Sequence, residues 1–241
     1  MKKIFITGGS GFIGRALIDH LLLNGFKIHC YDLVKFNHSS KHFKFFKGNI
    51  LEKEKINKAI RGCEIVIHLA ASLGVLNTEQ NNLECLDLNI FGTKNILEIS
   101  VKNNIKKFIF ASSSEIYGEQ KKFPISENAE PKFKSIYGLS KITAESYVKS
   151  FYQKYKMKYN IIRYFNVYGE GQRQDFVISK FTRNIKQNKN LKVYGDGKQI
   201  RSFCHVKDAV AGTLEIIRRA KSNTTYNVGN NLEPISMMKL A

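Results

Sequence analysis

The stretch IFITGGSGFIG, residues 4–14, joins an apolar run of β-forming residues to a glycine-rich turn. Apolar residues then recur at helical spacing from Phe12 onwards. A strand, a glycine turn and a helix in this order predict a dinucleotide-binding unit, because backbone amides in the turn can approach a pyrophosphate. We expect Gly8 to allow the tight turn, Gly11 to admit the pyrophosphate, and Gly14 to let the helix pack close to the strand.

The next predicted strand, residues 26–31, ends in Asp32. A carboxylate at this position can accept hydrogen bonds from both ribose hydroxyls of adenosine and would repel a 2′-phosphate. We therefore predict NAD, rather than NADP, as the cofactor, with Lys35 nearby as the one feature that favours a phosphate.

Strands and helices alternate along the rest of the chain. Strands are predicted at 43–46, 64–69, 108–111 and 159–164, and helices at 52–60, 83–101 and 136–155. This alternation predicts an α/β fold with a doubly wound parallel sheet of the Rossmann type, whose ligands lie at the carboxyl ends of the strands. We assign residues 1–165 to an NAD-binding domain and residues 166–241 to a smaller substrate lobe. The lobe is expected to contain strands at 191–194 and 202–206 and helices at 176–186 and 208–219.

Two short pieces carry the predicted chemistry, SSSE at 112–115 and YGLSK at 137–141. Tyr137 and Lys141 share one face of a helix. An ammonium one turn away favours the phenolate, so we expect Tyr137 to act as a base near neutral pH. Ser113, delivered by the end of a strand, would hold the substrate oxygen. The same Tyr–Lys spacing recurs elsewhere, but only Tyr137 opens a helix downstream of a strand that ends in serines.

Composition argues against several other classes of protein. The 241 residues are 43% apolar, which suits a globular core. The four cysteines have neither disulfide nor zinc spacing, so we expect no metal site and a reducing, cytoplasmic setting. No apolar run is long enough for membrane insertion. The formal charge of +19 would attract phosphates, but the lysines are spread over every segment without an Arg-rich recognition motif, so no nucleic-acid partner is expected.

A series of motifs in order resembles one enzyme family. These are TGGSGFIG at 7–14, HLAA at 68–71, SSSEIYG at 112–118, YGLSK at 137–141, RYFNVYG at 163–169 and YGDGKQIR at 194–201. Together they resemble the extended short-chain dehydrogenase/reductases of the nucleotide-sugar epimerase and dehydratase group. The resemblance implies a tightly held NAD on the first lobe and a nucleotide-diphosphate sugar between the lobes.

The resemblance also implies roles for individual residues. Ser113, Tyr137, Lys141 and Glu115 would be catalytic. The cofactor would be held by Gly8, Gly11, Phe12, Ile13, Gly14, Asp32, Asn49, Ile50, Leu69, Ala70, Ala71, Asn89, Tyr137, Lys141 and Tyr164. The substrate would contact Ser113, Asn166, Arg173, Val193 and Arg201. Asn49 stands where the family usually has an aspartate, and its amide oxygen can still accept from the adenine amino group.

The implied first step is removal of the 4-hydroxyl proton by Tyr137 with hydride transfer from C4 to NAD. An epimerase, similar to UDP-glucose 4-epimerase, then returns the hydride to the other face of the sugar. Glu115 keeps a 4,6-dehydratase or a UDP-glucuronate decarboxylase open as alternatives, and a non-catalytic NAD-binding regulator is a more remote one.

The resemblance bears on the extent and assembly of the chain as well. The sequence ends at Ala241, where family members continue through the substrate lobe. We therefore expect a truncated chain that binds NAD better than it turns over substrate. Helices near 83–103 and 137–155 would suit a homodimer.

Overall fold

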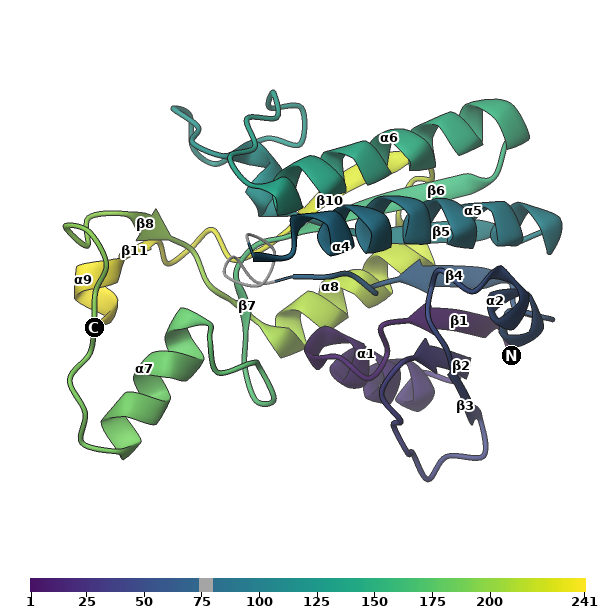
Figure 1. The fold of residues 1–241 in the computed structure, drawn as a ribbon, viewed down its shortest axis with the longest axis horizontal. Helices are drawn as coiled ribbons and strands as arrows, with labels where there is room; N and C mark the ends of the chain where they lie inside the picture. The colour runs from purple at the N-terminus through teal and green to yellow at the C-terminus, as the bar shows by residue number, and fades with distance from the viewer. Residues whose placement is uncertain (74–79) are drawn as a thin grey trace.

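A computed structural model describes residues 1–73 and 80–241. Its centre is a seven-stranded sheet in the order β10-β6-β5-β4-β1-β2-β3, in which every neighbouring pair is parallel (Figure 1). The strands are β1 (Lys3–Thr7), β2 (Lys27–Asp32), β3 (Phe43–Lys47), β4 (Ile65–His68), β5 (Lys107–Ser113), β6 (Lys158–Tyr164) and β10 (Thr224–Val228). The doubly wound parallel sheet predicted from the sequence is confirmed.

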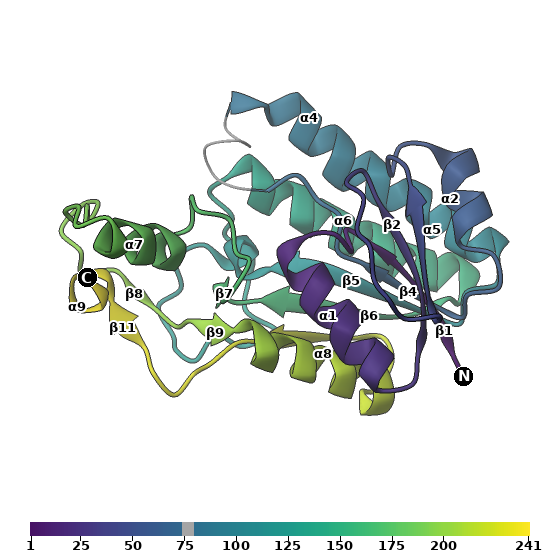
Figure 2. The same ribbon diagram turned by 90° about the horizontal axis from the view of Figure 1, so that it is seen from below.

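Helices cover both faces of the sheet (Figure 2). One face carries α1 (Phe12–Leu23) and α8 (Val206–Arg219), and the other carries α2 (Lys53–Ala59), α5 (Thr93–Lys102) and α6 (Ile136–Tyr155). An apolar core lies on each face of the sheet. Successive side chains of a strand point to opposite faces, so β1 contributes residues to both cores. Ile4 and Ile6 join the core under α1 and α8, whereas Phe5 joins the core under α2, α5 and α6.

A smaller lobe projects beyond the carboxyl ends of the strands (Figure 1). It contains α7 (Val177–Lys186), the pair β7 (Val167–Tyr168) and β9 (Cys204–His205), the pair β8 (Ile200–Arg201) and β11 (Ile235–Ser236), and α9 (Met237–Leu240). The strand predicted at 191–194 is wrong, because these residues form no strand. The strand predicted at 202–206 is shorter than expected and is preceded by β8.

Two elements beyond residue 165 lie on the main sheet rather than in the smaller lobe. We expected the helix at 208–219 to belong to the lobe, but α8 packs against α1 through Ala209, Val210 and Leu214. β10 then pairs with β6 along its whole length. The reason is apolar burial, since the inner face of α8 would otherwise lie exposed beside the edge of the sheet. The chain thus leaves the sheet after β6 and returns to it.

The helix predicted at 83–101 is not a single α-helix. It divides into α4 (Asn82–Leu86), a π-helical turn η1 (Asp87–Gly92) and α5, without a break in the chain's helical course. Single π turns of this kind are rare and often lie at functional sites. Among the described residues, no helix is long and apolar enough to cross a bilayer.

A buried ion pair ties α6 to the sheet. Arg163 of β6 donates two hydrogen bonds to the carboxylate of Glu145, at 2.9 and 2.7 Å, and a third to the hydroxyl of Tyr117 at 2.7 Å. Glu145 and Arg163 are both almost fully buried. Tyr117 in turn donates to Asn227 of β10. One network therefore joins α6, β6, β10 and the 3₁₀ turn η2 (Ser114–Tyr117) that follows β5.

We predict that Arg163→Met destabilises the protein by about 3–5 kcal/mol, because it leaves the Glu145 carboxylate buried without a partner. Denaturant unfolding measures the loss. The matched control is Lys106→Met, which breaks the exposed Lys106–Glu64 pair and is expected to cost less than about 1 kcal/mol. Equal losses in the two variants would contradict the prediction.

Candidate active site

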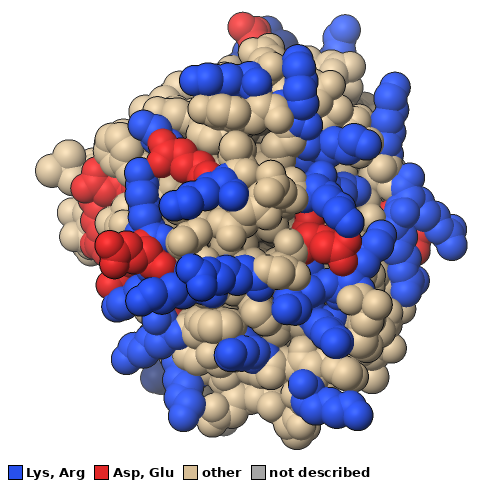
Figure 3. All heavy atoms as spheres, turned by 90° about the vertical axis from the view of Figure 1, so that its right-hand side faces the viewer, with Lys and Arg blue, Asp and Glu red and all other residues tan. Residues whose placement is uncertain are grey.

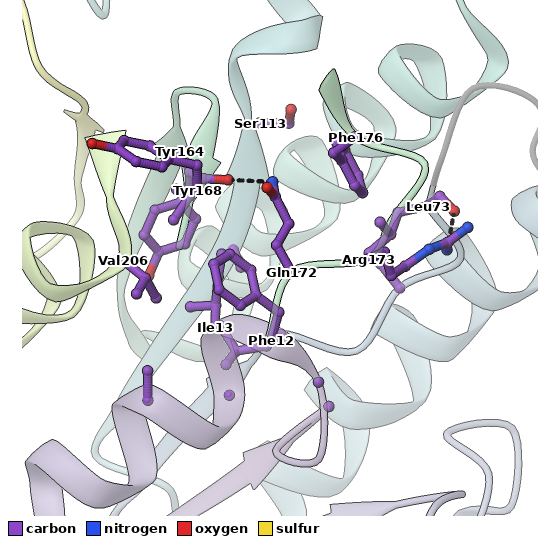
Figure 4. Close-up of a pocket in the computed structure, with 18 of the residues that line it drawn as sticks. Phe12, Ile13, Leu73, Ser113, Tyr164, Tyr168, Gln172, Arg173, Phe176 and Val206 are labelled. Atoms are coloured by element: carbon purple, nitrogen blue, oxygen red, sulfur yellow. Dashed lines mark hydrogen bonds between the residues drawn. The ribbon is translucent and has the colours of Figure 1, made fainter. Parts of the chain in front are cut away.

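A large cleft of about 1620 Å³ lies at the carboxyl edge of the sheet and is lined by residues of the sheet, of α1 and of the smaller lobe. Phe12 and Ile13 at the start of α1 form one wall, and Tyr164 and Val206 lie beside them (Figure 4). Residues from the smaller lobe, including Phe176, line the opposite side. The cleft therefore lies where ligands bind in open parallel sheets.

The glycine turn meets the backbone around it at close range. A Cβ atom on Gly8 would lie 2.6 Å from the backbone nitrogen of Ala70, and Gly8 has a φ of +72°. A Cβ on Gly14 would lie 2.3 Å from the carbonyl oxygen of Gly8. Gly11 is less confined, since its Cβ would meet only the Gly8 oxygen, at a tight 3.2 Å, and it lines the cleft. The turn is thus a close-packed cradle that is open on the cleft side, and it fits a pyrophosphate.

Asp32 is fixed at the end of β2 by two backbone amides. Oδ2 accepts from the amide of Ser10 and Oδ1 from the amide of Val34, both at 3.0 Å. A carboxylate has about four acceptor sites, so each oxygen can accept one more hydrogen bond. Asp32 is not among the residues that line the cleft. Its position beside the glycine turn nevertheless fits the ribose-binding role expected of it.

Ser113, Tyr137 and Lys141 come together in the cleft. Ser113 is the last residue of β5, and Tyr137 lies in the first turn of α6, which is capped by the Ser135 hydroxyl accepting from the amide of Gly138. The Ser113 hydroxyl accepts from the amide of Glu115 at 3.2 Å and lines the same cleft as the Tyr137 phenol. The Lys141 ammonium donates to the carbonyl of Ala111 at 2.8 Å and lies 5.7 Å from the centre of the Tyr137 ring.

The expected low pKa of Tyr137 is wrong for this arrangement. Burial raises the pKa of the phenol above its ordinary value, the negative charge of Glu115 raises it further, and the nearby polar side chain of Ser113 only partly offsets both. Lys141 is only 3% exposed, and burial lowers the pKa of its ammonium to about 8. The phenol is therefore protonated and the ammonium mostly charged at pH 7.

Asn89 lies in the π turn and joins three parts of the site. Its amide donates to the carbonyl of Ser72 and to the hydroxyl of Ser140, at 3.0 and 2.9 Å, and its oxygen accepts from the amide of Ser72 at 2.8 Å. Ser140 donates to the carbonyl of Tyr137 at 2.8 Å. The Asn89 side chain thus holds the loop after β4 and the first turn of α6. No sequence signal indicated the π turn that positions it.

The other predicted site residues divide into two groups. Lining the cleft are Gly8, Gly11, Phe12, Ile13, Gly14, Leu69, Ala71, Ser113, Glu115, Tyr137, Lys141, Tyr164, Asn166 and Arg173. Not lining it are Asp32, Asn49, Ile50, Ala70, Asn89, Val193 and Arg201. Asn49 uses its side-chain oxygen to accept from the amide of Leu51. Arg173 is paired with Asp175 and donates to the carbonyl of Leu73 (Figure 4).

Several residues of the cleft were missed in the sequence. Tyr168, Gln172 and Phe176 line it from the smaller lobe. Gln172 donates to the carbonyl of Val167 at 2.7 Å, which fixes the loop that follows β7. Tyr168 lies in the RYFNVYG motif, which could have indicated it, but no role was assigned to it, and no pattern pointed to Gln172 or Phe176. No cluster of metal-ligating side chains occurs in the part of the chain that the structure describes.

The parallel sheet and the glycine turn at its carboxyl edge define the class of dinucleotide-binding enzymes. The NAD dependent epimerase/dehydratase family model matches residues 4–229. The chain belongs to this family, and its cofactor is NAD.

Individual relatives cover nearly the whole chain. A putative UDP-glucose 4-epimerase of Methanocaldococcus jannaschii is 37% identical over 95% of this chain and 77% of the relative. A UDP-N-acetyl-alpha-D-glucosaminuronate decarboxylase of Bacillus cytotoxicus is 35% identical over 96% of this chain and 76% of the relative. The crystal structure of the Thermotoga maritima UDP-glucose 4-epimerase with UDP-glucose superposes with a TM-score of 0.92 at 30% identity, over 99% of this chain and 80% of that one.

We predict that Gly14→Ala weakens NAD binding by at least about tenfold, because the turn must shift to admit the methyl group. Calorimetric titration with NAD measures the affinity. The control is Gly212→Ala in α8, where the added Cβ would meet only Val228, at an ordinary 3.4 Å. A folded Gly14→Ala protein with unchanged NAD affinity would refute the role of the turn.

The lowered pKa of Lys141 also predicts a dependence of stability on pH. Between about pH 8 and 10.5 the unfolded chain keeps the Lys141 proton while the folded chain loses it, so this group adds stability as pH rises. We expect the unfolding free energy of the wild type, minus that of Lys141→Met, to increase from pH 7.5 to pH 10. The same difference for exposed Lys122→Met should stay flat. A Lys141 difference that falls with pH would be the contrary result.

Proposed function

We propose that this protein is an NAD-dependent nucleotide-diphosphate-sugar epimerase that acts at C4 of the sugar. The observation that carries the proposal is that Ser113, Tyr137 and Lys141 line the same cleft as the glycine turn. The two similar proteins named as UDP-glucose 4-epimerases support it.

In this proposal Tyr137 accepts the proton of the sugar's 4-hydroxyl while Ser113 holds that oxygen by a hydrogen bond. When bound, NAD supplies a hydride acceptor for C4 and a positive charge that lowers the pKa of a neighbouring phenol. Lys141 adds a second positive charge, because a pKa of about 8 leaves it mostly protonated at pH 7. The same phenol can return the proton in the second half of the reaction, so inversion at C4 needs no further acid.

The cofactor is proposed to lie along the glycine turn, with Asp32 as the acceptor for the adenosine ribose. Leu69 and Ala71 line the cleft after β4, and Lys141 would reach the nicotinamide ribose. The cleft lining does not include Asn49, Ile50 or Ala70. We propose that these three residues contact the adenine end of the cofactor.

The substrate is proposed to be a nucleotide-diphosphate sugar held against the smaller lobe, which is the part of residues 166–241 that lies outside α8 and β10. Asn166 and Arg173 line the cleft and suit its phosphates, since a guanidinium binds a phosphate through two parallel hydrogen bonds. On substrate binding, Arg173 would break its hydrogen bond to the carbonyl of Leu73 and donate to a substrate phosphate instead. Arg201 is exposed and outside the cleft, so a phosphate contact there requires its side chain to turn inward.

One observation favours a second candidate reaction. Glu115 lines the cleft and its amide donates to the hydroxyl of Ser113. A carboxylate beside the reacting carbon is what a dehydratase or a decarboxylase adds to the shared first step. The similar decarboxylase from Bacillus cytotoxicus is consistent with this alternative.

The test is to incubate the protein with a panel of nucleotide sugars and identify the products by NMR. An inverted C4 centre supports the epimerase, whereas a 4-keto-6-deoxy sugar or the loss of a carboxyl group selects the alternatives. We predict that Tyr137→Phe lowers turnover of the active substrate by about 10²–10⁴-fold, because it removes the proton acceptor. NAD affinity should change by less than about threefold. Turnover equal to the wild type would show that Tyr137 is not the proton acceptor, and no turnover of any sugar by the wild type would favour the non-catalytic alternative.

A second variant separates the two candidate reactions. We predict that Glu115→Gln leaves C4 epimerisation within about threefold of wild type, because inversion uses only the Tyr137 proton. The same change should lower a dehydratase or decarboxylase activity by about tenfold or more. Progress curves on the active substrate measure both, with Tyr137→Phe as the inactive reference. A large loss of epimerisation would assign Glu115 to the epimerase itself.

A further inference from the structure

The edge of the sheet opposite the cleft is strongly basic. The parallel strands begin there, and the helices that cross between them end there, because each crossover helix runs antiparallel to its strands. This basic edge comprises Lys2, Lys3, Lys27, Lys58, Arg61, Lys102, Lys106, Lys107, Lys154, Lys156, Lys158, Arg218, Arg219 and Lys221. Figure 3 looks onto this side of the molecule, and Lys and Arg side chains cover much of it.

Helix dipoles account for only part of this charge. Cations near helix ends, such as Lys102 and Arg219, compensate the negative ends of α5 and α8. Lys107, at the start of β5, likewise donates to the carbonyl of Ile216 in the last turn of α8, at 2.8 Å. Sheets have only small net dipoles, so no helix dipole accounts for Lys3, Lys27 and Lys158 at the starts of β1, β2 and β6. Lys3 is directly in register with Lys27, and Lys107 with Lys158. Like charges paired across strands are unfavourable, and an anionic surface would relieve the repulsion.

Few carboxylates balance these cations locally. Glu64 is paired with Lys106 at 2.8 Å, and Glu215 with Arg219 at 3.3 Å. The pKa of Lys107 is lowered, first by partial burial and then by the charge of Lys2. Positive charge is therefore in excess along this edge, although the lysines look evenly spread in the sequence.

Exposed apolar side chains lie among the cations. Leu23, the last residue of α1, is 87% exposed, Met1 is 64% exposed, and Tyr155 at the end of α6 is 45% exposed. Lysines interspersed with protruding apolar residues suit the headgroup region of an anionic bilayer, which takes both. A nucleic acid is less well suited, because the edge is rich in lysine rather than arginine, and Arg218 is bonded to Asn24.

We propose that the basic edge docks this protein reversibly on membranes that contain anionic lipids. Lys27 and Lys158 contact the lipid phosphates and carboxylates, and Leu23 inserts at the interface. The orientation follows from the fold. Ser113 and Tyr137 lie in the part of the cleft at the carboxyl ends of the strands, so that part faces away from the membrane and stays accessible to soluble substrates. The lining of the cleft also continues along α1 as far as Leu23.

The test is co-sedimentation of the full chain with vesicles of phosphatidylcholine, with and without phosphatidylserine. We expect binding only to the phosphatidylserine vesicles and release as salt is raised. Lys27→Glu/Lys158→Glu should lower the partition coefficient by about tenfold or more, since each lysine at an anionic surface contributes about 1 kcal/mol. Lys121→Glu/Lys122→Glu changes the net charge equally in an exposed loop elsewhere, and should change binding by less than about threefold. Circular dichroism checks that each variant is folded.

Leu23→Gln separates lipid from nucleic acid, because only insertion at an interface needs the apolar side chain. We expect it to weaken vesicle binding and to leave any binding of duplex DNA or RNA unchanged. The proposal fails if the wild type does not bind anionic vesicles, if the two charge-reversal variants lose binding equally, or if nucleic acid is bound more tightly than the vesicles. None of these outcomes depends on which sugar the cleft accepts.

Discussion

The close approach of backbone to backbone at the glycine turn is the constraint on which the site depends. Gly8 and Gly14 leave no room for a Cβ atom, so the end of β1, the start of α1 and the end of β4 meet directly. That contact fixes the position of α1 against the sheet, and Gly8, Gly11 and Gly14 line the cleft. The neighbouring amide of Ser10 is held by Asp32, which fixes the end of β2 to the same turn.

The sequence predicted most of the sheet and its covering helices because their signals are local. Apolar strands, the glycine turn and the serine cluster need no knowledge of distant residues, and the helix that begins with Tyr137 was equally readable. Three features depend on contacts far along the chain and were missed. These are the π turn at Asn89, the return of α8 and β10 to the sheet, and the raised pKa of Tyr137, which follows from burial rather than from the Lys141 spacing.

Helix α6 is held by two different kinds of bonding along its length. At its first turn, neutral hydrogen bonds from Asn89 through Ser140 fix the carbonyl of Tyr137. Two turns further on, the buried charge of Glu145 meets Arg163 of β6. The hydrogen bonds through Ser140 orient the candidate base and involve no charged group. The ion pair of Glu145 with Arg163 anchors the helix in the core. Stability and positioning are thus separated on one helix, within about 12 Å at 1.5 Å rise per residue.

The chain crosses between the sheet and the smaller lobe three times, after β6, before α8 and after β10. The first crossing has Asn166 in a left-handed backbone conformation, and its carbonyl accepts from the amide of Cys204 at the second crossing. The third is held to the first by the Phe165 amide, which donates to the carbonyl of Val228. Three chain connections therefore join the lobe to the sheet, and a movement of the lobe over the cleft would require all three to change conformation together. Such a joint favours small rocking motions over a wide hinge opening.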